Sequence, residues 1–255
     1  TWYIKFDGRG HSIKNMAYSG TDTWCLFGTV AAGGYINNLK LENLNVTSSG
    51  NCYGLSYQLY GDMFNCHVRG SVSGAAVCGV TRLHDSGNID CCSFVGSLTG
   101  TAQIAGIGFA QAANNVGRMT VCYVAADLRC SGVTGSSIVS AIGYHSYIQN
   151  CFFRGNLYPP STSWSYFYAN NVRSAGAGNS RYCYIILENA AQLKARGFAA
   201  ASNLWGGNPI CCLHNTIYDE DDETTYDWAT QSSGEGTDEA NLHDAMWLRR
   251  KGMAI

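Results

Sequence analysis

The strongest constraint on the fold is a short block of sequence that recurs about every 28 residues along most of the chain. Each copy consists of an apolar residue, two variable residues and a fourth residue that is usually Cys. A repeat of this length indicates a solenoid or a propeller, because one unit cannot bury its apolar face without its neighbours. The copies begin at Ile13, Ile36, Met63, Ile89, Met119 and Ile148, with degenerate copies at Ser180 and Pro209.

Short strands are predicted in each repeat. After Cys66 the chain alternates through Val68, Gly70 and Val72, and this period of two indicates a strand. A second strand, small and apolar, is predicted before each block, as at residues 54–56. The frame of a leucine-rich repeat is absent, and a propeller blade needs about 40 or more residues. The sequence therefore predicts an all-β, parallel β-helix (solenoid) of about 7–8 coils.

Each coil is predicted to turn a corner just before the fourth residue of the block. Asn15, Asn38, Asn65 and Asn150 share this position. Asn tolerates left-handed backbone and bonds to its own neighbours, which suits a tight corner. Stacked Asn side chains also add amide hydrogen bonds between coils. We therefore expect a column of Asn along one corner.

The cysteines are predicted to form a packing column rather than a disulfide scaffold. The chain has 12 Cys, and those at the fourth position are expected to point inward as small hydrophobes with free thiols. The chain has no CxxC motif, and zinc requires four convergent ligands. Free thiols favour a virion protein assembled inside a cell, or an anaerobe's surface protein. The predicted column is Cys66, Cys92, Cys122, Cys151, Cys183 and Cys212.

Several segments resemble the GLUG repeat family. They are INNLKL at 36–41, NCHVRGSVSG at 65–74 and NCFFRGNL at 150–157, and residues 6–16 resemble the opening coil of many right-handed β-helix proteins. The resemblance covers residues 6–157 well and 158–217 poorly, and the family's G-x-x-x-G signature is eroded. It implies a right-handed parallel β-helix in a bacterial surface or adhesin-like protein, or in a phage structural protein. It carries over no catalytic residues.

The repeat leaves the C-terminal part of the chain as a separate region. Residues 1–217 are assigned to the β-helix, with excursions at 158–171 and 188–208. Residues 218–236 are assigned to an acidic and polar loop, and residues 237–255 to a C-terminal capping helix. The helix is expected to cover the open end of the β-helix, since an exposed sheet edge invites aggregation. An oligomer contact, and hence a homo-oligomer, is the alternative.

Composition excludes two classes of partner. The net charge of −2 gives no basic stripe for nucleic acid. No run of about 18 apolar residues is present, so no membrane span is expected. No cofactor motif is found, because the repeated Gly residues are not followed by a helix. We expect no cofactor.

An aromatic-rich segment is the predicted ligand-binding region. Tyr158, Trp164, Tyr166 and Tyr168 could pack against the apolar faces of sugars, while nearby Asn and Ser residues supply hydrogen bonds. The alternative is a loop whose aromatic side chains fold back over a coil.

The acidic run at 219–223 is the one segment that could bind a metal. Asp219, Asp221 and Asp222 are candidate calcium ligands, because oxygen-rich loops bind this ion. The alternation of an EF-hand loop is missing, and a solvated acidic loop is the alternative. Elsewhere no metal site is predicted.

Catalytic residues do not stand out. Polysaccharide hydrolysis would need two carboxylates about 5 to 9 Å apart. Aligning the repeats places no acid beside Asp90 or Asp127, and His67, His84 and His145 have no evident nucleophile partner. If the protein is a polysaccharide hydrolase or lyase, the candidate residues are Asp62, Asp85, Asp90 and Asp127.

The sequence therefore predicts a non-catalytic, surface-exposed recognition or adhesion module, either a cell-surface adhesin or a component of a phage fibre or spike. Its expected partner is a glycan or a host or bacterial surface, and its expected location is the extracellular surface or the virion surface. The alternatives are a tailspike-like polysaccharide depolymerase and a structural spacer without a ligand. All three rest on fold analogy.

Overall fold

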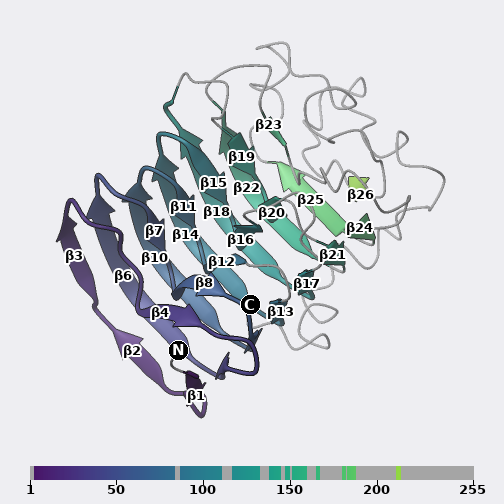
Figure 1. Ribbon diagram of the computed structural model, residues 1–255. Coiled ribbons are helices and arrows are strands. Elements are labelled where there is room, and N and C mark those ends of the chain that lie inside the picture. The colour runs from purple at the N-terminus through teal and green to yellow at the C-terminus, as the bar shows by residue number, and fades with distance from the viewer. Residues whose placement is uncertain are drawn as a thin grey trace, which may run out of the picture.

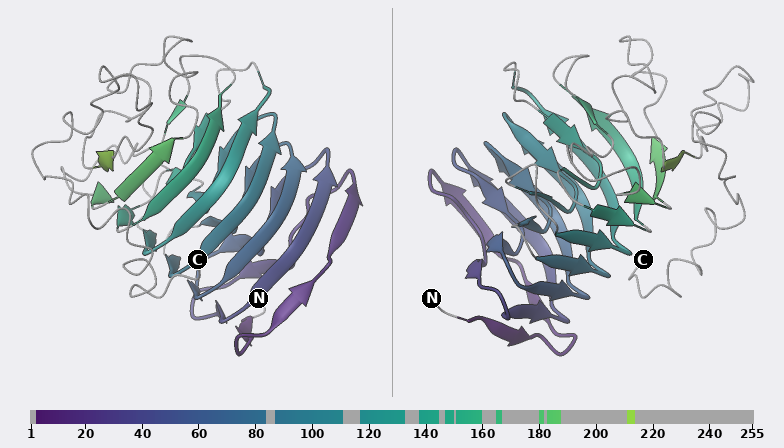
Figure 2. Two further views of the ribbon diagram at one scale, coloured as in Figure 1. Left: turned by 180° about the vertical axis from the view of Figure 1, so that it is seen from behind. Right: turned by 45° about the vertical axis from the view of Figure 1, so that its right-hand side comes forward.

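In the residues it describes, the computed structural model is an all-β parallel solenoid of about five turns (Figure 1). Each complete turn contributes one strand to each of four parallel sheets, which we name A to D. Figure 2 shows the long strands of sheet B side by side as one broad face. The structure describes residues 3–83, 87–110, 117–132, 138–144, 147–149, 151–159, 165–166, 180–181, 183–187 and 211–213.

The strands of the four sheets follow one another in the same order in each turn. Sheet A contains β1 (Lys5–Asp7), β5 (Tyr35–Asn37), β9 (Asp62–Phe64), β13 (Asn88–Asp90), β17 (Arg118–Thr120), β21 (Tyr147–Gln149) and β24 (Ser180–Arg181). Sheet B contains β2 (Ser12–Lys14), β3 (Ala17–Gly20), β6 (Lys40–Ser48), β10 (His67–Gly74), β14 (Ser93–Gly100), β18 (Tyr123–Cys130), β22 (Phe152–Tyr158), β25 (Cys183–Leu187) and β26 (Cys211–Leu213). Sheet C contains β7 (Cys52–Tyr53), β11 (Val77–Cys78), β15 (Gln103–Ala105), β19 (Ile138–Ser140) and β23 (Ser165–Tyr166). Sheet D contains β4 (Phe27–Val30), β8 (Ser56–Leu59), β12 (Thr81–Leu83), β16 (Gly108–Ala110) and β20 (Gly143–Tyr144).

The parallel solenoid is confirmed, and the described residues contain about five of its turns. The predicted total of 7–8 coils stays a prediction, because it includes residues outside the described ranges. The described residues contain no helix. The predicted excursion at 188–208, the acidic loop at 218–236 and the capping helix at 237–255 lie outside the described residues.

The register confirms the repeat from Ile36 to Ser180 and corrects its first copy. Ile36 pairs with Met63 in sheet A as predicted, but its partner in the preceding turn is Phe6. The block at Ile13 instead belongs to sheet B, where Ile13 pairs with Leu41. Residues 13–16 have the same apolar spacing as the sheet A block, but they lie on the following strand, in sheet B.

The predicted corner is confirmed, and it uses left-handed backbone even where Asn is absent. Asn38 and Asn65 have φ values of 53° and 51°, and the Asn65 side chain donates to Oδ1 of Asn38 at 2.8 Å. Cys91 and Val121 occupy the same position with φ values of 53°. Asn15 is wrong as a member of this column, because it lies beside Asn43, whose Nδ2 donates to its Oδ1 at 2.7 Å. Asn150 lies outside the described residues.

The cysteine column is confirmed inside the solenoid. Cys66, Cys92, Cys122 and Cys151 are buried with free thiols. The Cys92 thiol donates to the carbonyl of Asp90 at 3.2 Å, and the others also donate to main-chain carbonyls. A small side chain that can satisfy a corner carbonyl explains why Cys recurs where Ala or Val would also fit.

One predicted member of the column is wrong. In sheet B, Cys183 pairs with Cys211 and not with Cys212. The two adjacent cysteines fit the pattern equally well in the sequence, and a shift of one residue exchanges the two faces of a strand.

The predicted second strand is a bend between two strands. Gly54 and Leu55 connect β7 to β8, and Leu55 is fully buried at the bend. A Cβ atom on Gly54 would collide with the carbonyl oxygen of Gly79 in the next turn. The small residue therefore permits the close approach of successive turns at this corner.

A glycine column also lies within sheet B. Gly70, Gly96 and Gly155 have φ values of 153°, 142° and 139°, and Ala126 takes the equivalent position in the intervening turn. A Cβ atom on Gly96 would collide with the carbonyl oxygen of Gly70. These glycines let the long strands bend while their ladder of hydrogen bonds continues.

We predict that Val121→Asn stabilises the protein. A left-handed conformation costs an L-residue about 1–2 kcal/mol, and Asn tolerates it far better than a β-branched side chain. We expect the free energy of unfolding to rise by about 1 kcal/mol, measured by urea unfolding. An unchanged or lower midpoint would show that Val121 is not strained.

We also predict that Gly96→Ala destabilises the protein while Gly28→Ala does not. A methyl group at Gly96 meets the main chain of the preceding turn, whereas no atom lies within 4 Å of the corresponding position at Gly28. The loss at Gly96 should exceed about 1 kcal/mol, since its φ is also unfavourable for Ala. Equal melting temperatures for the two variants would contradict this account of the column.

Candidate functional site

The outer face of sheet B carries rows of side chains from equivalent positions in successive turns. One row, which we call the His67 row, pairs Lys40, His67, Ser93 and Tyr123 on neighbouring strands. The next row along the strands, the Arg69 row, consists of Arg69, Val95, Ala125 and Arg154. Neighbouring strands are about 4.8 Å apart, so each row is closely spaced.

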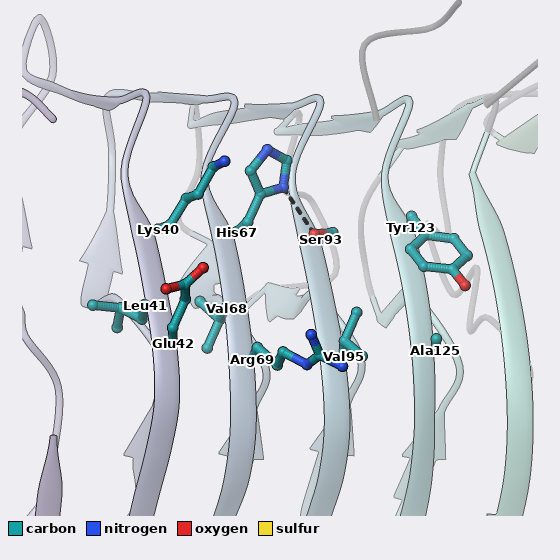
Figure 3. A pocket seen from close by; sticks show the side chains of 10 residues that line it. All are labelled: Lys40, Leu41, Glu42, His67, Val68, Arg69, Ser93, Val95, Tyr123 and Ala125. Atoms are coloured by element: carbon teal, nitrogen blue, oxygen red, sulfur yellow. Dashed lines mark hydrogen bonds between the residues drawn. The ribbon is translucent and has the colours of Figure 1, made fainter. Parts of the chain in front are cut away.

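The two rows enclose a hollow of about 400 Å³ (Figure 3). Its shape follows from side-chain size, because Val95 and Ala125 are short while Arg69 and Arg154 on either side of them are long. In Figure 3 the Arg69 side chain extends from β10 towards Val95 on β14. The hollow is lined by Lys40, Leu41, Glu42, His67, Val68, Arg69, Ser93, Val95, Tyr123 and Ala125.

A second hollow of about 380 Å³ continues the first along the solenoid. The two share Tyr123 and Ala125, and the second adds Asp127, Arg154 and two members of the glycine column, Gly96 and Gly155. Together they form a trough that crosses the strands from β6 to β22. We call this surface the sheet B trough.

A chain of hydrogen bonds leads into the trough from the corner of the solenoid. Asn38 donates to Oδ1 of Asp7 at 3.1 Å, and Asn65 donates to Oδ1 of Asn38 at 2.8 Å. His67 Nε2 lies 2.9 Å from Oδ1 of Asn65, and His67 Nδ1 lies 2.8 Å from Oγ of Ser93. We call these five residues the Asp7–Ser93 relay.

The direction of every hydrogen bond in the relay follows from its carboxylate end. Ionised Asp7 only accepts, so Asn38 and then Asn65 present their amide nitrogens towards it and their oxygens away from it. The Asn65 oxygen therefore accepts from Nε2–H of His67. In the neutral ring Nδ1 is then an acceptor, and the Ser93 hydroxyl donates a hydrogen bond to it.

This arrangement corrects the expectation that His67 has no nucleophile partner. His67 directly follows Cys66 and Ser93 directly follows Cys92, so the repeat alignment itself places the two residues side by side. His84 and His145 lie outside the described residues.

Burial and charge both favour the neutral form of His67. Burial, and secondarily the nearby Lys40 ammonium, lowers the pKa of His67 from 6.5 to about 4. At the other end of the relay, the Arg9 amide and then the Asn38 side chain hold the pKa of Asp7 below its ordinary value. The relay thus joins an ionised carboxylate to a neutral imidazole.

The structure describes three of the four candidate acids for glycan cleavage. Asp62 and Asp90 lie on neighbouring strands of sheet A, where Asp62 accepts from Asn88 at 2.8 Å and Asp90 from Thr120 at 2.8 Å. Asp127 lies on sheet B and lines the trough. The predicted register partners of Asp127, which are Ser97 and Asn156, are confirmed. Asp85 lies outside the described residues.

The predicted aromatic platform is only partly described. Tyr158 lies at the end of β22 in sheet B, where the Arg129 guanidinium stacks 3.6 Å from its ring centre. Tyr166 lies on β23 in sheet C, so these two residues belong to different sheets. Trp164 and Tyr168 lie outside the described residues.

No group of three or more potential metal ligands is found among the residues that the structure describes. The candidate calcium ligands Asp219, Asp221 and Asp222 lie outside that part of the chain. In the same described ranges, no helix is long and apolar enough to cross a membrane.

No family model, no curated protein and no solved structure matches the chain. The resemblance to GLUG repeats therefore rests on the quoted segments alone. Functional inference has to come from the trough and the relay.

We predict that His67 makes stability depend on pH between about 6.5 and about 4. In this window unfolded His67 binds a proton and folded His67 does not, so stability falls as the pH falls. The contribution is at most about 1.4 kcal/mol per pH unit, the value for one proton. Urea unfolding of His67→Gln should show a weaker pH dependence in this window than the unmodified protein, and equal slopes would contradict the lowered pKa.

Proposed function

We propose that the protein is a recognition module that binds an acidic glycan in the sheet B trough, at the extracellular surface of a cell or on a virion. The observation that carries the proposal is the trough itself. Two hollows share Tyr123 and Ala125 and run across successive strands, which suits an extended chain better than a compact small molecule.

The charges of the trough favour an anionic ligand. Lys40, Arg69 and Arg154 contribute three cations to its lining. The acids are engaged by cations from neighbouring positions, since Glu42 pairs with Lys14 at 2.9 Å and Asp127 pairs with Arg129 at 3.2 Å. Within the described part of the chain Arg69 has no ion-pair partner, so its guanidinium can take a carboxylate or sulfate in a bidentate manner.

The floor of the trough suits the apolar face of a sugar ring. Val95 and Ala125 are partly exposed there, while Tyr123 is held by stacking on Phe152 with ring centres 5.5 Å apart. Small apolar side chains framed by polar ones are typical of ligand sites. All the lining residues stand on paired strands, so the site is rigid before a ligand binds.

The surface location is supported by the GLUG-like segments, whose family occurs in bacterial surface proteins and phage structural proteins. The thiols are compatible with it. Burial raises the pKa of Cys52 to about 11, and burial raises the pKa of Cys92 as well, so these thiols stay protonated. Because the thiolate is the reactive form, burial protects these two thiols even in an oxidising environment.

The test is binding to a panel of acidic and neutral polysaccharides, with Arg69→Ala as the variant and Arg118→Ala as the matched control. Both residues are exposed arginines, but Arg118 lies on sheet A. Hydrogen bonds to a charged group contribute about 1.5–3 kcal/mol, so Arg69→Ala should weaken binding about tenfold or more. Arg118→Ala should bind as the unmodified protein does.

The same samples are assayed for new reducing or unsaturated chain ends. Retention without new ends supports recognition, whereas new ends would indicate a depolymerase. Equal binding by the two variants would exclude the trough as the site. Lack of retention on every polysaccharide would reject the proposal in favour of a structural spacer.

A further inference from the structure

We propose that the sheet B trough also hydrolyses small carboxylic esters, with Ser93 Oγ as the nucleophile and His67 as the general base. The substrate class is an acyl ester of about acetyl size. Only the nature of the alcohol, a hydroxyl of the bound glycan, rests on the function proposed above. The esterase activity itself rests on the Asp7–Ser93 relay.

The direction of the hydrogen bond between Ser93 and His67 supports the proposal. A serine is activated when its hydroxyl proton points at the free nitrogen of a neutral imidazole. At His67 the proton position is fixed by Asn65, which accepts from Nε2–H at 2.9 Å. Nδ1 is therefore the free nitrogen, and it lies 2.8 Å from Oγ of Ser93.

A third residue, Asn65, orients the His67 ring. In serine and cysteine hydrolases a carboxylate or an amide orients the imidazole and stabilises it once it has taken the proton. Asn65 orients the His67 ring, and its own amide leads through Asn38 to the Asp7 carboxylate. Stabilisation of the corner between turns is enough to explain the hydrogen bond between Asn65 and Asn38. It does not explain why the chain of hydrogen bonds continues through His67 to Ser93 on sheet B.

The position of Ser93 and His67 in the trough also supports the proposal. Ser93 and His67 both line the first hollow of the trough. Ser93 is 2% exposed and sits on β14 between two paired strands, which restricts its hydroxyl to a narrow range of positions. The substrate must place its acyl group inside the hollow, and this favours small acyl groups.

The proposed reaction has two steps. Ser93 Oγ attacks the ester carbonyl carbon while its proton moves to His67 Nδ1, and the bond from the carbonyl carbon to the alkoxy oxygen then breaks. The leaving alkoxide takes the proton from Nδ1, which leaves an acyl-serine and a free alcohol. Water then attacks the acyl-serine with His67 again as base, and the products are a carboxylic acid and the original Ser93.

Lys40 is the group that can stabilise the negative oxygen of the tetrahedral intermediate. It stands opposite His67 on the neighbouring strand, and Figure 3 shows its side chain rising beside the His67 ring. Its charge is close enough to lower the pKa of His67. A cation at a developing oxyanion contributes to catalysis, and in the proposed reaction the Lys40 side chain reaches it across His67 from the side opposite Ser93.

The low pKa of His67, about 4, has two effects on such a reaction. It keeps the imidazole neutral at pH 7, and only the neutral ring can accept the serine proton. It also makes the ring a weak base, because base strength follows the pKa. We therefore expect a slow esterase whose activity is lost as the pH falls through about 4.

The test uses the full chain with p-nitrophenyl acetate as substrate and a fluorophosphonate as a covalent probe. Mass spectrometry of the digested protein should place the phosphonyl group on Ser93. Ser93→Ala should lose the labelling and at least tenfold of the hydrolysis rate. Ser97→Ala is the matched control, since Ser97 is a partly exposed serine of the same strand outside the trough lining, and it should keep both.

His67→Gln and Lys40→Met provide independent variants. We expect both to be labelled at least tenfold more slowly at Ser93, with melting temperatures that show them to be folded. Labelling at another residue, no labelling, or equal hydrolysis by folded Ser93→Ala would overturn the proposal. Polysaccharide retention is measured separately, so loss of glycan binding with intact Ser93 labelling would reject only the recognition function.

Discussion

The ladder of hydrogen bonds between successive turns is the interaction on which the rest of the structure depends. It brings residues about 27 positions apart in the sequence, such as Ile36 and Met63, to within one strand spacing of each other. Equivalent positions of successive repeats then become neighbours, so a residue type that recurs at one repeat position forms a column along the axis. The cysteine column, the glycine column and the rows of the trough are all products of this single rule.

The ladder also sets where the chain has no freedom. At the corner the backbone must be left-handed, and Asn38 and Asn65 meet this demand with a side chain suited to it. Val121 meets it without such a side chain, which shows that the ladder overrides local preference. At the glycine column the constraint is spatial as well, because the main chain of the preceding turn occupies the place of a Cβ atom.

The repeat made much of the fold predictable, but not its start or its four-sided cross-section. Spacing placed Asp90 beside Phe64 and Thr120, and the register agrees. The same spacing misplaced Asn15, because a bulge at Asn43 gives sheet B its own imitation of the block. Two strands joined at a tight bend cannot be distinguished from one by a pattern of three small residues such as 54–56.

The candidate site was only partly predictable for a related reason. The pairing of His67 with Ser93 is contained in the repeat alignment, since each follows a column cysteine. The depth of the trough is not, because it depends on how Arg69 and Arg154 stand above Val95 and Ala125 once the strands are packed. The direction of the relay needs the orientation of each amide, which spacing alone does not contain.

Because the relay is built from several turns, the fold can be retained when the relay is lost. Its members come from four successive turns of the solenoid, and no single repeat contains more than two of them. Deleting residues 67–92 would remove one whole repeat and join Cys66 to Ser93, which leaves the column of buried thiols in phase. The shortened solenoid would keep its architecture and lose its imidazole. In a lineage of such chains, gain and loss of repeats can therefore create or erase chemistry without a single point substitution.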